Sequence, residues 1–109
     1  MRYLFSRCQR LTKKSEFEAL YSTGLKRTVG PLLIHRKPNA LSHSRLGLSV
    51  PRRAGNAVQR NKLKRLCREA FRLLNSSLPK HMDILITVRP HTPMDVHSYV
   101  EMIEEGVSP

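Results

Sequence analysis

The pattern that most constrains the fold of this chain runs from residue 57 to residue 74. At about 100° per residue, the apolar side chains of this segment collect on one side of a helix and the basic side chains on the other. The apolar side comprises Leu63, Leu66, Cys67, Ala70, Phe71 and Leu74. Such a side has to be buried against other elements, so the pattern predicts a long helix lying on a core, with Asn56 as its N-cap.

The opposite side of this predicted helix carries almost only positive charge. It presents Asn61, Lys64, Arg65, Arg68 and Arg72 within a sector of about 100°, with Arg60 in the first turn and Lys62 beside them. Like charges three and four positions apart cost a helix a few tenths of a kcal/mol per pair. Phosphate groups would offset this repulsion, and the strip is roughly 16 Å long, enough to meet several phosphates of one nucleic-acid backbone.

A solvated charged surface is the alternative interpretation of this strip. Solvated surfaces normally mix signs, whereas only Glu69 interrupts this one, and Arg52 and Arg53 extend it at its start. The chain as a whole has 20 Lys and Arg against 8 Asp and Glu, a net charge of +12 in 109 residues. A charge of that size favours a polyanionic partner, nucleic acid above an anionic membrane, because the bases lie opposite the apolar side instead of flanking it.

The rest of the chain predicts one small α+β domain, residues 1–109, with a basic N-terminal arm over residues 1–14. A short helix is expected after Ser15, which forms a capping-box pattern with Glu18, and Gly24 ends it. Strands are expected over 31–37, 45–50 and 83–90, and a last helix follows Asp95. The order αββαβα favours a mixed or antiparallel sheet with helices on one face. A strand and "PRRAGN" precede the basic helix, which disfavours a helix-turn-helix DNA reader and favours RNA.

Two aromatic residues, Phe17 and Tyr21, lie four positions apart on the first predicted helix. They are either core residues beneath that helix or the lining of a cleft on the sheet where single-stranded bases stack. Leu33 and His35, on alternate positions of one strand, would continue such a cleft.

Nothing in the sequence predicts catalysis by the protein's own side chains. The histidines are scattered, at positions 35, 43, 81, 91 and 97, and no metal-ligand or Ser/His/Asp spacing occurs. Cys8 and Cys67 form no C-x-x-C pair, and Cys67 falls on the apolar side of the long helix. No apolar run is long enough for a membrane span or a signal peptide, so we expect a reducing, cytoplasmic setting. A stand-alone protein nuclease is disfavoured.

The segment "GLSVPRRAGNAVQRNKLKRLCREAFR" resembles the bacterial ribonuclease P protein subunit, whose signature is a strand, two basic residues, "GNAV" and the RNR helix. The segments "RLTKKSEFEALYSTG" and "DILITVRP" are also similar to that family. Two positions depart from its pattern: Lys62 stands third in the RNR triplet and lacks the bidentate fork, and Tyr21 stands where phenylalanine is common.

The resemblance implies a ribonucleoprotein endonuclease, in which a large catalytic RNA holds the Mg²⁺ ions and removes the 5′ leader of precursor tRNA. It implies RNA binding by residues 52–74, through Arg52, Arg53, Arg60, Asn61, Lys62, Lys64, Arg65, Arg68 and Arg72. It also implies a leader cleft formed by Phe17, Tyr21, Leu33 and His35. The implied fold is ribosomal protein S5 domain 2-like, with a left-handed βαβ crossover, and no obligate protein partner is expected. A general or ribosomal RNA-binding protein without a role in cleavage is the alternative.

Overall fold

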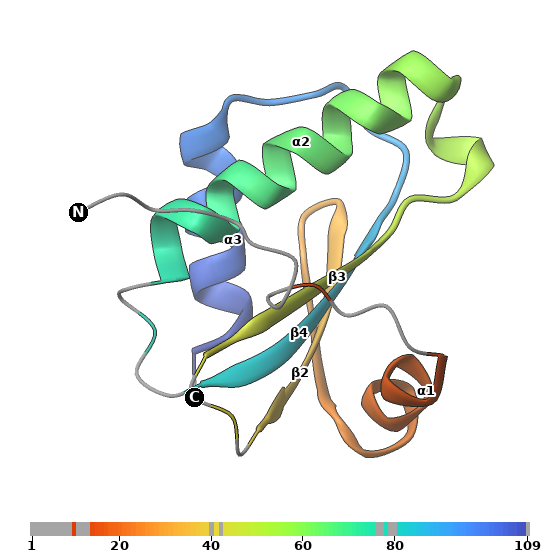
Figure 1. The fold of residues 1–109 in the computed structure, drawn as a ribbon. Helices are drawn as coiled ribbons and strands as arrows, with labels where there is room; N and C mark the ends of the chain where they lie inside the picture. The colour runs from red at the N-terminus through yellow and green to blue at the C-terminus, as the bar shows by residue number, and fades with distance from the viewer. Residues whose placement is uncertain are drawn as a thin grey trace.

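The chain folds around one mixed four-stranded sheet (Figure 1). The computed structural model describes residues 10, 14–39, 41, 43–75, 78 and 81–108. In chain order the elements are α1 (Lys14–Thr23), β1 (Leu25–Val29), β2 (Leu32–Pro38), β3 (Arg45–Ser49), the 3-10 helix η2 (Arg52–Ala54), α2 (Ala57–Leu74), β4 (Met82–Val88) and α3 (Val96–Gly106). The predicted α+β class is confirmed.

The strands lie in the order β1-β2-β4-β3. Strand β2 pairs antiparallel with β1 and with β4, whereas β3 and β4 are parallel. Helix α2 connects these two parallel neighbours, and this βαβ unit is the one whose crossover the family resemblance implies to be left-handed.

The predicted order αββαβα omitted strand β1, and this is a correction. Strand β1 lies at an edge of the sheet, and four of its five residues are exposed. Its sequence "LKRTV" therefore lacks the apolar alternation of a half-buried strand. The signal that remained was the turn after it: Gly30 has a φ of 55° and Pro31 follows, as in a two-residue type II′ hairpin turn.

The helices cover both faces of the sheet, so the expectation of helices on one face was wrong for α1. Ile84 and Ile86 of β4 belong to the main core with residues of α2 and α3. Leu85, between them, packs in a second cluster with Leu20 of α1. Because successive side chains of a strand point to opposite faces, α1 lies on the face opposite α2 and α3, as Figure 1 shows.

Helix α2 is positioned by its cap and by its apolar side. Asn56 Oδ1 accepts a hydrogen bond from the backbone N–H of Gln59 at 2.9 Å, and Gln59 Oε1 accepts one from the backbone N–H of Asn56 at 2.8 Å. The predicted N-cap is thus confirmed. The predicted apolar residues are buried in the core, except for Leu66, which is partly buried against it. The orientation of α2 on the sheet is therefore determined by its sequence pattern.

The other two helices begin differently from each other. Asp95 caps α3 as expected, since its carboxylate accepts a hydrogen bond from the backbone N–H of Ser98 at 2.9 Å. Helix α1 begins at Lys14, which places Ser15 inside the first turn and not at the N-cap. Ends of helices predicted from sequence commonly shift by this amount.

Candidate nucleic-acid interface

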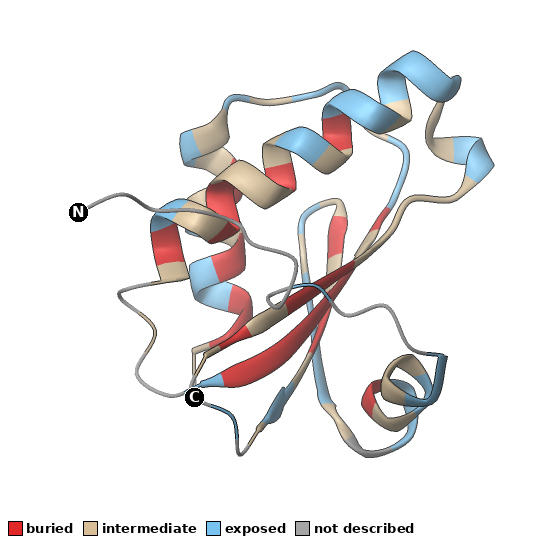
Figure 2. Cartoon of the chain, viewed as in Figure 1, coloured by how far each residue is buried: buried red, intermediate tan, exposed pale blue. Residues whose placement is uncertain are grey.

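The predicted RNA-binding residues form a basic strip along η2 and the outer side of α2. We define the basic strip as Arg52, Arg53, Arg60, Asn61, Lys62, Lys64, Arg65, Arg68 and Arg72. The two arginines of η2 are exposed, and so are Asn61, Lys62 and Arg65. Figure 2 shows this exposure on the outer side of the N-terminal half of α2. The structure therefore presents most of the strip to solvent.

The strip is hollowed by two open depressions on the surface of α2. One, of about 420 Å³, is lined by Val58, Asn61, Arg65 and Arg68. The other, of about 590 Å³, is lined by Arg10, Lys62, Arg65, Leu66, Arg68, Glu69, Arg72 and Val96. Arg65 and Arg68 line both, so two guanidinium groups stand where either depression could receive a phosphate.

Positive charges crowd each other in the larger depression. The pKa of Arg68 is lowered by partial burial and, secondarily, by the positive charge of Arg10. Arg10 reaches this place because its backbone forms an isolated bridge with Leu46 at the outer edge of β3. An anion bound between the two arginines would relieve their repulsion. Arg10 was predicted only as part of a basic arm, and its pairing with β3 left no local signal in the sequence.

Two members of the strip differ from the others. Arg72 Nε donates a hydrogen bond to Glu69 Oε2 at 3.0 Å. This contact raises the pKa of Arg72 and lowers the pKa of Glu69. Its charge is therefore partly neutralised. Arg60 lies about 140° around the helix from Arg65. Its Nε is buried and, within the described part of the chain, has no hydrogen-bond acceptor.

The residues predicted for the leader cleft lie together on the face of the sheet that α1 covers. We call Phe17, Tyr21, Leu33 and His35 the aromatic surface. Tyr21 is 54% exposed, and its ring meets that of His35 edge-on, with 5.0 Å between centroids and 79° between planes. Phe17 packs half-buried against the cluster of Leu20 and Leu85. Phe17 thus serves partly as core, whereas the ring of Tyr21 is available to a partner.

His35 is the most buried member of the aromatic surface. Burial, and then the positive charge of Lys26 on the adjacent strand, lower the pKa of His35 below its usual value of 6.5. Its Nδ1 is buried without a hydrogen-bond partner among the described residues. At neutral pH the buried imidazole of His35, in edge-on contact with the ring of Tyr21, is therefore uncharged.

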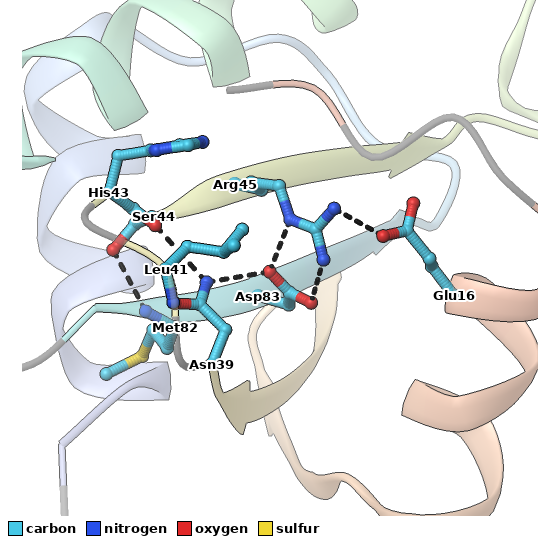
Figure 3. A network of polar contacts seen from close by, with 8 residues as sticks. All are labelled: Glu16, Asn39, Leu41, His43, Ser44, Arg45, Met82 and Asp83. Carbon is cyan, nitrogen blue, oxygen red and sulfur yellow. Dashed lines mark hydrogen bonds and ion pairs between the residues drawn. The ribbon is translucent and has the colours of Figure 1, made fainter. Parts of the chain in front are cut away.

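A polar network that the sequence did not predict joins α1 to the sheet beside the aromatic surface (Figure 3). Arg45 of β3 contacts the carboxylates of Asp83 on β4 and Glu16 on α1, and Asn39 also contacts Asp83. One sequence signal was present: β3 begins with a positive residue and the strand over 83–90 was expected to begin with a negative one. Parallel pairing places these two residues opposite each other.

The described residues contain no group of three or more His, Cys, Asp or Glu side chains that could hold a metal ion. Within the same residues, no helix combines the length and apolar character of a membrane span. Cys67 is a free, buried thiol whose pKa is raised by burial to about 12, which confirms its prediction as core. Cys8 lies outside the described residues.

The basic helix α2 and helix α3 on one face of a mixed four-stranded sheet, with α1 on the other face, define a class of small basic α+β proteins. The sequence matches the family described as Ribonuclease P over residues 5–107. The chain belongs to this family of ribonuclease P proteins.

Individual relatives agree with this assignment. The ribonuclease P protein component of Caldanaerobacter subterraneus subsp. tengcongensis is 37% identical over 97 residues, covering 88% of this chain and 84% of that protein. The component of Desulfovibrio desulfuricans is 34% identical over 106 residues, covering 95% and 82%.

Solved structures show the same fold. The RNase P protein of Thermotoga maritima superposes with a TM-score of 0.77 at 30% identity, covering 88% of this chain and 92% of that one. A Staphylococcus aureus RNase P protein mutant with defective mRNA degradation activity gives a TM-score of 0.82 at 29% identity, covering 93% and 86%.

Proposed function

We propose that the chain is the protein subunit of bacterial ribonuclease P, which binds the catalytic RNA and the 5′ leader of precursor tRNA and so promotes endonucleolytic removal of the leader. The observation that carries this proposal is the exposed basic strip of α2 in a chain of this family. Arg65 and Arg68 line two depressions on the same helix, which suits repeated contacts with one phosphate backbone.

The protein's part in the reaction is binding and positioning. The basic strip neutralises phosphates of the catalytic RNA, so that the folded RNA is stable at lower Mg²⁺ concentration. The aromatic surface receives the single-stranded leader, with the exposed ring of Tyr21 as a platform for a base. These two surfaces are on different elements, so one protein can contact the RNA subunit and the leader together.

The chemistry in this proposal belongs to the RNA. Divalent metal ions, Mg²⁺ in this proposal, would be held mainly by the partner RNA and would supply an activated nucleophile and charge stabilisation there. The protein's residues are not assigned a catalytic step. A cytoplasmic location, where precursor tRNA is processed, is part of the same proposal.

The decisive test compares the affinity of the reconstituted holoenzyme for precursor and for mature tRNA. We expect tighter binding of the precursor, and we expect Tyr21→Ala to reduce that preference by about 1–3 kcal/mol, the contribution of stacking to one base. Tyr21→Phe is the matched control, because it keeps the ring and should keep the preference. A holoenzyme that binds both tRNAs equally, with or without the ring, would support the general RNA-binding alternative.

A further inference from the structure

The guanidinium group of Arg45 is the centre of the network in Figure 3. Its Nε and Nη2 donate to the two carboxylate oxygens of Asp83, at 2.8 and 2.7 Å, and its Nη1 donates to Glu16 Oε2. Asn39 Nδ2 donates to Asp83 Oδ1 at 2.9 Å. The hydrogen bond to Asp83, followed by that to Glu16, raises the pKa of Arg45 against the effect of burial.

This arrangement makes Arg45 unlike the arginines of the basic strip. Its side chain is 19% exposed, and it faces two carboxylates, so the local charge is not positive. A bidentate arginine–carboxylate pair has a defined geometry, because both groups are planar and two parallel hydrogen bonds join them. Arg45 is therefore held rigidly on the sheet, with Nη1 directed at α1.

Two contacts of helix α1 with the sheet are one helical turn apart. Leu20, 1% exposed, packs against Leu85 of β4. Glu16, four residues earlier and thus on the same side of the helix, binds Arg45. Among the described residues, this apolar cluster comprises Leu20 and Leu85, both fully buried, with Phe17 partly buried beside them. The Glu16 contact adds a directional link to this apolar contact, because the guanidinium that binds Glu16 is itself held by Asp83.

The orientation of α1 determines where the aromatic rings lie. Phe17 follows Glu16 directly, and Tyr21 follows Leu20 directly, so each ring is adjacent to one of these two contacts. The edge-on contact of Tyr21 with His35 on β2 depends on this orientation. A rotation of α1 about its axis would move both rings relative to β2.

We propose that Arg45 is a positioning residue: through Glu16 it fixes α1 on the sheet and so sets the leader-binding geometry of Phe17 and Tyr21. The inference rests on the proposed function of the aromatic surface. Its consequence is that the preference for leader-bearing tRNA depends on residues that do not contact the leader.

The test uses Glu16→Gln in the full-length protein, reconstituted with a bacterial ribonuclease P RNA. Glu18→Gln is the matched control, because it makes the same change of charge on the same helix. Glu18 is exposed, and its carboxylate lies 3.9 Å from the amino group of Lys14, which is also exposed. We expect Glu16→Gln to lower the affinity for precursor tRNA by about three- to tenfold, through loss of one charge-assisted contact. The affinities for mature tRNA and for the catalytic RNA should stay unchanged.

A second variant, Arg45→Lys, keeps the charge but cannot bridge two carboxylates, and should cause the same selective loss. The inference is overturned if Glu16→Gln keeps the full preference for precursor, if it weakens precursor and mature tRNA equally, or if Glu18→Gln has the same effect. If the wild-type holoenzyme itself shows no preference, the proposed function fails, and this inference fails with it. The wild-type measurement thus distinguishes the two failures.

Discussion

Arg65 offers the sharpest test of the basic strip. It is exposed, and it lines both depressions on α2. We predict that Arg65→Gln removes one phosphate contact to the catalytic RNA. Each such contact contributes about 0.7–0.9 to the slope of the logarithm of the binding constant against the logarithm of salt concentration.

The magnitude follows from that slope. At about 0.1 M salt, one lost contact of this kind lowers the affinity by about five- to eightfold, or about 1 kcal/mol. The difference between wild type and variant should shrink as salt increases and approach zero near about 1 M, because counterion release no longer favours binding there. A constant difference at all salt concentrations would indicate a contact other than a phosphate.

The assay is equilibrium binding of a labelled bacterial ribonuclease P RNA over a series of salt concentrations. Arg27→Gln is the matched control, because it removes the same charge from β1, where Arg27 donates a hydrogen bond to the carbonyl of Glu105 at 2.8 Å. The control should leave the slope unchanged. If Arg65→Gln and Arg27→Gln give the same slope as each other, α2 is not the phosphate-binding surface, and the reasoning from the strip is refuted.

Three further predictions concern stability and reactivity. The folded chain holds the pKa of His35 below 6.5, so the unfolded chain binds a proton first as pH falls. The free energy of unfolding should therefore decrease as pH is lowered through 6.5 and become constant below the pKa of the folded state. His35→Asn should remove this dependence in denaturant titrations. Gly55→Ala should lower the free energy of unfolding by about 1–3 kcal/mol. Gly55 has a φ of 146°, and a Cβ at this position would lie 2.9 Å from Cβ of Gln59. An unchanged thermal midpoint of unfolding would contradict this prediction. Cys67, buried with a pKa of about 12, should resist iodoacetamide in the native protein and react after unfolding, as peptide mapping would show.

The parts of the fold that the sequence predicted are those whose signals are local. Helix α2 combines a capping residue, an apolar side and a basic side within one segment, and each is found where it was expected. Strand β1 was missed because an exposed edge strand has no reason to alternate apolar and polar residues. The position of α1 on the opposite face was also missed. The residue that contacts Leu20, Leu85, lies in a strand that is buried on both faces, so the strand's pattern does not indicate that a helix covers its second face.

The site was predicted in the same uneven way. Within α2, the residues of the basic strip follow from helical spacing, and the structure exposes Asn61, Lys62 and Arg65 among them. Glu69 and Arg72 are three positions apart on α2, so helical spacing could also have indicated the ion pair that partly neutralises Arg72. The links from Arg45 to Asp83 and Glu16 cross 38 and 29 positions of sequence. Pairs that distant depend on the register of β3 with β4 and on the placement of α1, and neither follows from local pattern.

The most direct measurement is leader cleavage at low Mg²⁺, with labelled precursor tRNA, a bacterial ribonuclease P RNA and this protein, each component alone and both together. We predict a correct 5′ cut only when RNA and protein are both present, and no cut by the protein alone. If the protein binds the RNA but leaves the rate of cleavage unchanged, the basic strip is a general RNA-binding surface and the proposed function is wrong.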